Sequence, residues 1–321
     1  MLELDVHLLR FQAVVTAPLR LPPAAGAALR GALFGALRAQ FCLASGGPDC
    51  GQPAVAARCP VCFLLAPVDE GNRRGQDVPR PYVLRVAPDA PATYAAGQAF
   101  AFELATFGHA LGVFPYTLLG IQEMGRRGLG QARAGGFRLA EVWAENPLAG
   151  RQERLYRAGE AQVRTPTLPI TAGDVAAEVA ALVGQGGGRR LRLSLRTPTR
   201  LVEAGRLVKE ESFQPRLLLA RLLDRLDALG ARYGGGPVQA KAPALLAHAA
   251  SIQVAERRLR WRELFRASGR HRALLPMGGL VGEVVLEGDL APLLPWLVWG
   301  TLVHVGKDAA MGNGELRLSA V

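Results

Sequence analysis

The sequence HVGKDAAMGNG occupies residues 304–314, between an apolar segment that is predicted to be helical and a short final strand. Glycines admit positive φ and let a backbone approach a ligand closely. Successive exposed N–H groups in such a loop can bind an anion, and Lys307 adds a positive charge. The loop lacks a Gly-Lys-Ser/Thr ending and leads into a strand, which excludes a Walker A nucleotide site. Taken alone, the simpler interpretation is a tight turn.

A second glycine-rich loop, GRRGLG at residues 125–130, also follows a predicted helix and leads into a strand. Because no helix follows it, a dinucleotide-binding fingerprint is excluded. Two such loops at matching places indicate that the two halves of the chain share one plan.

Hydrophobic periodicity predicts the same order of elements in both halves, that of the β-α-β-β-α-β ferredoxin-like plan. In the first half we expect strands at 4–16, 79–86, 100–106 and 137–143, and helices at 25–42 and 110–124. In the second half we expect strands at 190–195, 252–260, 279–286 and from residue 315, and helices at 213–229, 243–251 and 289–299, the last capped by Asp289.

The sequence therefore predicts an α+β protein with two tandem ferredoxin-like (RRM-like) domains, at 1–175 and 188–321. The first domain would carry a cysteine-containing loop insertion at 42–62, and the second the glycine-rich loop 304–314. The segment from residue 146 to residue 188 contains several prolines and a run of glycines, and is predicted to be a loose connection.

The chain of 321 residues has a formal net charge of +11, from 38 Lys and Arg against 27 Asp and Glu. Most of the cations are Arg, whose planar guanidinium binds phosphate through two hydrogen bonds and stacks on bases. A GC-rich genome would also favour Arg, so charge alone leaves RNA binding and codon bias open. No signal peptide or membrane span is visible, and we expect a soluble, cytoplasmic protein with no membrane partner.

All four cysteines fall in one window, at Cys42, Cys50, Cys59 and Cys62. In a reducing cytoplasm such clustering favours a metal over disulfides. The two-residue gap between Cys59 and Cys62 suits two thiolate ligands of one tetrahedral Zn²⁺, whereas the spacing of the first pair is looser than in most zinc knuckles. A structural zinc ion and unpaired thiols are the main alternatives, and a disulfide is the third. A catalytic thiol is not expected, because no histidine lies nearby in sequence.

Several motifs together resemble CRISPR pre-crRNA processing endoribonucleases of the RAMP (repeat-associated mysterious protein) superfamily. The resemblance rests on their order and spacing and covers nearly the whole chain. The motifs are LRGA at 29–32, the cysteine loop, PRPY at 79–82, GRRGLG at 125–130, TPTRL at 197–201, the helix from Phe213, LVGEVVLEGDL at 280–290 and the final glycine loop.

The resemblance implies two ferredoxin-like domains and cleavage of the repeat in the CRISPR precursor transcript. It implies chemistry without a metal, in which the 2′-hydroxyl upstream of the scissile phosphate attacks it and leaves a 2′,3′-cyclic phosphate and a 5′-hydroxyl. The expected partner is CRISPR repeat RNA (pre-crRNA), with CRISPR effector complex subunits as further candidates and a monomer or homodimer as the assembly. No cofactor is expected for catalysis, which leaves structural zinc as the one expected metal.

In-line attack needs a base for the 2′-hydroxyl, a cation for the phosphorane and an acid for the leaving oxygen. Related enzymes often carry a histidine on the first helix, in a run similar to RGAFGHALR. Here residues 30–38 read RGALFGALR, and Gly35 occupies the histidine position. His304 is then the first catalytic candidate, with an alternative structural role in ordering the turn. His7 is the second candidate, and Lys307 could stabilise the phosphorane.

The residues predicted to contact RNA are basic residues and glycines of the first helix and the loops. They are Arg30, Arg38, Arg126, Arg127, Gly128, Gly130, Arg270, His271, Gly306, Gly312 and Gly314. For the two helix arginines alone, a solvated face is the simpler alternative.

Two other functions stay open at this point. Because the helix histidine is missing, the chain could be a non-cleaving RNA-binding subunit that holds the crRNA handle in an effector complex. A zinc-dependent enzyme is the weaker reading, because four cysteine ligands would leave no open catalytic position on the metal.

Overall fold

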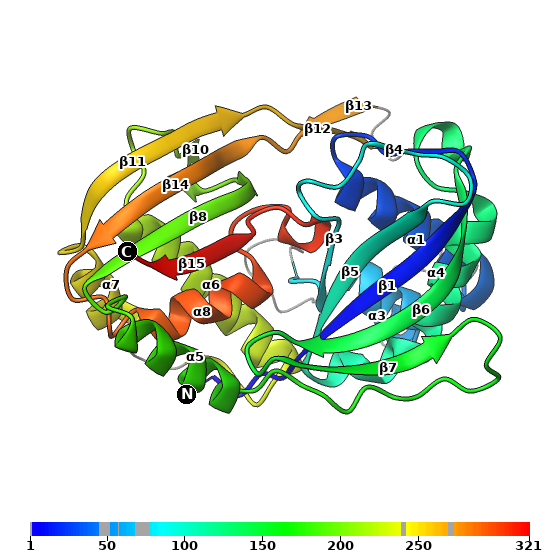
Figure 1. Ribbon diagram of the computed structural model, residues 1–321, viewed down its shortest axis with the longest axis horizontal. Helices are drawn as coiled ribbons and strands as arrows, with labels where there is room; N and C mark the ends of the chain where they lie inside the picture. Colours follow the sequence, from blue (N-terminus) through cyan, green and yellow to red (C-terminus); the bar gives the residue numbers. More distant parts are fainter. Residues whose placement is uncertain (1, 45–51, 57, 68–77, 239–241, 269–272) are drawn as a thin grey trace. The chain divides into compact units, whose positions relative to one another are not determined.

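The computed structural model of the protein describes residues 2–44, 52–56, 58–67, 78–238, 242–268 and 273–321 (Figure 1). The chain forms two compact units. The N-terminal unit comprises His7–Asn146 and Arg151–Pro169, and the C-terminal unit comprises Met1–Val6, Pro147–Gly150 and Ile170–Val321. In the described residues, no helix combines the length and the apolar character that crossing a bilayer requires.

The N-terminal unit is built on a five-stranded sheet with the order β3-β5-β1-β6-β7. Its strands are β1 (Val6–Ala17), β3 (Tyr82–Arg85), β5 (Ala99–Phe107), β6 (Gly136–Asn146) and β7 (Arg151–Arg157). Its helices are α1 (Ala25–Phe41), α2 (Pro53–Ala56), α3 (Pro60–Leu65) and α4 (Phe114–Arg127), with 3₁₀ turns η2 (Gly108–Val113) and η3 (Gln131–Arg133) and a short strand pair β2 (Leu19–Arg20) and β4 (Thr93–Tyr94).

The C-terminal unit has a four-stranded sheet with the order β11-β14-β8-β15. Its strands are β8 (Arg190–Thr199), β11 (Gln253–Arg262), β14 (Gly279–Glu287) and β15 (Leu316–Ala320). Its helices are α5 (Ala172–Gly184), α6 (Pro215–Tyr233), α7 (Ala242–Ala249) and α8 (Leu294–Val303), with the 3₁₀ turn η4 (Ala309–Met311) and the strand pairs β9 (Val202–Glu203) with β10 (Arg206–Leu207) and β12 (Phe265–Ser268) with β13 (Ala273–Pro276).

Both sheets follow one topology. If the four main strands of each unit are numbered along the chain, their order across the sheet is second, third, first, fourth in both cases. In each unit the second main helix, α4 or α8, is followed by a glycine-rich loop and then by the fourth strand. The matching places that the two glycine loops occupy in the sequence are therefore matching places in the fold.

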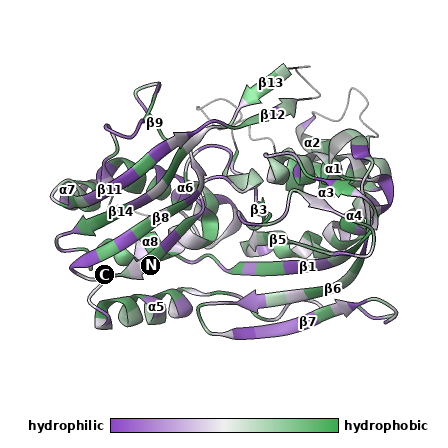
Figure 2. Cartoon of the chain, turned by 45° about the horizontal axis from the view of Figure 1, so that its top comes forward, coloured by the Kyte–Doolittle hydropathy of each residue, from purple (hydrophilic) through white to green (hydrophobic). Residues whose placement is uncertain are grey.

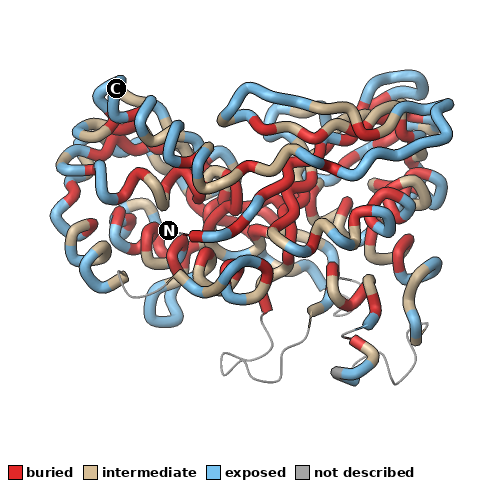
Figure 3. Tube along the Cα trace, turned by 90° about the horizontal axis from the view of Figure 1, so that it is seen from below, coloured by how far each residue is buried: buried red, intermediate tan, exposed pale blue. Residues whose placement is uncertain are grey.

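Alternating side chains separate the two faces of the C-terminal sheet. Leu191, Leu193 and Leu195 of β8 are at most 2% exposed, whereas the residues between them are partly exposed. Apolar residues three and four apart along α6 supply the facing layer, since Leu222, Leu226 and Leu229 are fully buried. Figure 3 shows buried residues along the inner segments of the chain and exposed residues along the outer ones.

The segment predicted to be a loose connection contains two regular elements, so that expectation is wrong. Strand β7 has the sequence RQERLYR, in which only Leu155 is buried, and Figure 2 shows it as hydrophilic over most of its length. An edge strand of this composition lacks an apolar signal. Helix α5 begins with a capping box, in which the Thr171 side chain accepts from the Asp174 N–H and the Asp174 carboxylate accepts from the Thr171 N–H.

The predicted cap of α8 is also wrong. The helix begins at Leu294, with Leu293 as its N-cap and Pro295 in the first turn, where the missing N–H of proline does no harm. Asp289 precedes that start by a turn, and its carboxylate lies 3.8 Å from Nε2 of His248.

Candidate nucleic-acid interface

The C-terminal glycine loop, residues 304–314, is tied to the end of β8. The Lys307 N–H donates to the Arg200 carbonyl oxygen at 3.0 Å. The Thr197 hydroxyl donates to the Gly312 carbonyl oxygen at 2.8 Å. Because both partners of the loop lie at one strand end, the sheet fixes the conformation of the loop.

The glycines of this loop are required by its backbone. Gly306, Gly312 and Gly314 have φ of 85°, 86° and 74°, values that residues other than glycine rarely adopt. A Cβ on Gly314 would overlap the Val305 carbonyl oxygen, and one on Gly306 would lie 2.6 Å from the Arg200 carbonyl oxygen. Loop closure thus accounts for the glycines, and their contact with RNA stays a prediction.

His304 lies at the base of the same loop. It caps the C-terminal end of α8 with a φ of 62° and is 1% exposed. Its Nδ1 lies 3.0 Å from the Asn313 carbonyl oxygen, and the Asn313 amide donates to the Met277 carbonyl oxygen at 2.9 Å. In this conformation the imidazole orders the turn and is closed to solvent.

The three catalytic candidates differ in accessibility. Lys307 is exposed, in the same loop as His304. His7 is 6% exposed on β1 and belongs to the N-terminal unit. A role in cleavage stays a prediction for all three residues.

The two arginines of α1 have different surroundings. Arg30 is half-buried, and its guanidinium donates to the Leu65 carbonyl oxygen at 3.1 Å, which ties α1 to the end of α3. Arg80 donates to the same oxygen at 3.2 Å. Burial raises the pKa of the neighbouring Tyr82 phenol, although the positive charges of Arg30 and Arg80 lower this pKa in part. Arg38 is exposed in the last turn of α1.

The loop GRRGLG at 125–130 of the N-terminal unit also contains glycines with positive φ. Gly128 and Gly130 have φ of 92° and 82°. Arg126 and Arg127 are exposed, and their guanidinium nitrogens lie 3.0 Å and 3.9 Å from the Glu123 carboxylate. Beside this loop lie Arg133 and Arg138, which were not predicted as site residues because neither belongs to a motif.

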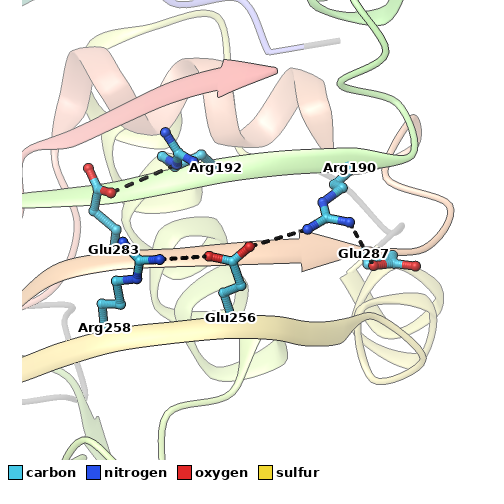
Figure 4. Close-up of polar contacts among 6 residues, drawn as sticks. All are labelled: Arg190, Arg192, Glu256, Arg258, Glu283 and Glu287. Atoms are coloured by element: carbon cyan, nitrogen blue, oxygen red, sulfur yellow. Dashed lines mark hydrogen bonds and ion pairs between the residues drawn. The ribbon is translucent and has the colours of Figure 1, made fainter. Parts of the chain in front are cut away.

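Three arginines of the C-terminal sheet form ion pairs with glutamates (Figure 4). The pairs are Arg190 with Glu256 (3.3 Å) and Glu287 (3.8 Å), Arg192 with Glu283 (3.8 Å), and Arg258 with Glu256 (3.4 Å). Such exposed pairs add little to stability. They reduce the attraction of these three arginines for phosphate.

Three predicted site residues lie outside the described residues. Arg270 and His271 fall between β12 and β13, and Cys50 falls between α1 and α2. Their predicted roles stay predictions.

Of the other cysteines, Cys59 is the N-cap of α3, Cys62 lies within α3, and Cys42 is the C-cap of α1. Cys59 and Cys62 are buried, and Cys42 is half-buried. Burial raises the pKa of the Cys59 thiol, but hydrogen bonds from backbone N–H groups, that of Leu43 first among them, lower it more, and the net pKa is below the ordinary value. Within the described ranges, no three His, Cys, Asp or Glu side chains converge to hold a metal ion. The predicted zinc site includes Cys50, which lies outside the described residues, and the site stays a prediction.

Two models of known protein families match this chain. Residues 193–316 match the CRISPR-associated endoribonuclease Cas6 family, and residues 4–168 match the AF_1859 N-terminal domain family. The C-terminal part of the chain therefore carries a domain of the Cas6 family of RAMP-type CRISPR proteins. The Cas6 match contains the glycine loop at 304–314, and the N-terminal match contains the loop at 125–130.

Solved structures show the same fold. The chain is similar to a chain of the "Partial Cas6-RT-Cas1--Cas2 complex", with 13% identity, a TM-score of 0.62, and coverage of 100% of this chain and 47% of that chain. It is similar to a "Cas6 product complex" at 18% identity, TM-score 0.54 and 99% of both chains. It is also similar to Thermus thermophilus Cas6 at 16% identity, TM-score 0.51 and 98% of both chains. No curated protein matches the chain in sequence.

The closure of the C-terminal loop predicts a large effect for Gly314→Ala. We expect it to lower the free energy of unfolding by roughly 3 kcal/mol, because an alanine there pays the left-handed backbone penalty and also displaces the Val305 carbonyl. Gly205→Ala is the matched control: its φ is 79°, yet nothing lies within 4 Å of its Cβ position. It should lose only about 1 kcal/mol in the same urea titration. Equal losses would show that the close approach does not matter.

Proposed function

We propose that this chain binds CRISPR repeat RNA and cleaves it within the precursor transcript. The observation that carries the proposal is the Cas6 family match over residues 193–316, a range that contains the glycine loop held against β8. We infer that the two units are two ferredoxin-like domains, since both have the same strand order and the same helix–loop–strand ending.

The proposed reaction is a transesterification that needs no metal. The 2′-oxygen of the nucleotide upstream of the scissile bond attacks the phosphorus and gives its proton to a base. A new bond from the 2′-oxygen to phosphorus forms, and the bond from phosphorus to the 5′-oxygen breaks. The leaving 5′-oxygen takes up a proton, so the products are a 2′,3′-cyclic phosphate and a 5′-hydroxyl.

Lys307 is the best placed of the predicted catalytic residues, because its ammonium is exposed at the loop and can meet the charge of the phosphorane. His304 remains our first candidate for proton transfer, and His7 the second. Both are buried in the described conformation, so either role requires that RNA binding rearrange the surroundings of the imidazole. Orientation and charge would then supply much of the rate, and cleavage would be slow.

A non-cleaving RNA-binding subunit is the second candidate function. The observations that favour it are the glycine at position 35 of α1 and the burial of both candidate histidines. Such a subunit would hold the crRNA handle with the same loops.

The two functions differ in the RNA products. Purified chain in EDTA is expected to convert its cognate repeat RNA into a fragment that ends in a 2′,3′-cyclic phosphate, detected by mass spectrometry. A 2′-deoxy substitution at the nucleotide upstream of the cut should abolish cleavage and leave the Kd unchanged, because it removes only the nucleophile. Tight binding without any cyclic product over hours would instead establish the non-cleaving subunit.

A histidine at position 35 should accelerate cleavage. Among the described residues, the Arg133 Nη2 atom at 3.8 Å is the one contact found within 4 Å of the Cβ position at Gly35, so a Cβ fits there without displacing the backbone. If the scissile phosphate binds beside this part of α1, the imidazole of Gly35→His adds acid–base catalysis and should raise the single-turnover rate by roughly tenfold or more.

The control for this variant is Gly31→His, one turn earlier on α1. Nothing lies within 4 Å of the Cβ position at Gly31, and the residue is exposed, so this histidine should leave the rate unchanged. A rate for Gly35→His no higher than that of the control would place the chemistry elsewhere.

A further inference from the structure

A basic pocket of about 330 Å³ opens beside the second glycine loop, within the N-terminal unit. It lies between the end of α4, the turn at residues 133–134 and the start of β6. Four arginines line it: Arg126, Arg127, Arg133 and Arg138. Small residues, mainly glycine and alanine, make up much of the rest of the wall, so an approaching ligand meets backbone and guanidinium groups.

Two of these arginines are already paired and two are not. Arg126 and Arg127 share the carboxylate of Glu123. Arg133 and Arg138 are exposed, and among the residues that the structure describes no carboxylate pairs with either of them. The pocket therefore holds two guanidinium groups with no carboxylate partner in the described part of the chain, in contrast to Arg190, Arg192 and Arg258 on the C-terminal sheet.

The backbone that carries Arg133 is held in an unfavourable conformation. Ala132 and Arg133 have φ of 53° and 55°, and non-glycine residues in this region cost on the order of 1–3 kcal/mol each. Two hydrogen bonds between Leu129 and Gly135, of 2.6 Å and 3.1 Å, close the turn around them. A Cβ on Gly128 would overlap the Arg133 carbonyl oxygen, so the turn also requires that glycine. Strained backbone that the surrounding structure holds in place is often found at binding sites.

The turn directs Arg133 toward α1. Among the described residues, its Nη2 atom is the one atom found within 4 Å of the Cβ position at Gly35. The guanidinium thus lies beside a helix position that has no side chain.

We propose that this pocket binds a backbone phosphate of RNA, with Arg133 and Arg138 as the binding residues. The guanidinium fork matches two phosphate oxygens, and two such groups without a counterion favour a dianionic or polyanionic ligand. The inference rests on the proposed function only in taking RNA as that ligand. Because a phosphate contact carries no sequence information, the pocket positions the strand and does not select it.

The test compares two double variants that lose the same charge. Arg133→Ala with Arg138→Ala should weaken binding of 2′-deoxy, uncleavable repeat RNA by roughly tenfold, as expected when charge-assisted hydrogen bonds are lost. It should also lower the slope of log Kd against log salt by about 0.7 for each phosphate contact removed. Arg154→Ala with Arg157→Ala is the control, since both of these arginines pair with Glu141 on the same unit. Its Kd should stay within twofold of the unchanged protein.

A second RNA of unrelated sequence separates this proposal from the proposed function. The Arg133 and Arg138 variant should bind it more weakly too, because the contact is to the backbone. If the unchanged protein bound both RNAs equally and did not cleave the repeat, the proposed function would fail while the pocket stood. If the variant matched the Arg154 and Arg157 control in Kd and in salt slope with both RNAs, the pocket would be refuted.

Discussion

Close approach of backbone to backbone, at glycines that follow the second main helix, is the constraint on which each unit depends. At Gly314 and at Gly128 a side chain would overlap a carbonyl oxygen of the same loop. The chain can therefore turn from helix to fourth strand without a bulky side chain between them. Because the turn is tight, the polar groups of each loop are held by the adjoining strand end or by a short bridge. Rigid loops of this kind lose little entropy when they bind a ligand.

Part of the charge of the C-terminal sheet is paired. Arg190, Arg192 and Arg258 form ion pairs with glutamates of the same sheet. Lys307 lies in the C-terminal glycine loop and Arg133 lies beside the N-terminal one, and both are exposed. A polyanion would thus meet a cation at each loop. The same distribution makes binding strongly dependent on salt, since phosphate contacts release counterions.

Much of the fold could be predicted, because apolar side chains repeat regularly where an element has one buried face, as in α6 and β8. Strand β7 was not predicted, because its one buried residue produces no hydrophobic period. Helix α5 was not predicted either, although Thr171 and Asp174 form a capping box. The site was harder to predict. Sequence placed His304 beside the glycine loop, but its burial depends on Asn313 and Met277, which only the fold brings together. Arg133 belongs to no motif, and its place beside Gly35 results from two left-handed residues.

The central claim is that both glycine loops hold the backbone of one RNA. A crystal structure of the chain with repeat RNA that carries a 2′-deoxy nucleotide at the cut site tests it most directly. The account predicts one phosphate within hydrogen-bond distance of Lys307 and another within that distance of Arg133. RNA bound along the open face of the C-terminal sheet, with neither loop in contact with a phosphate, would contradict it.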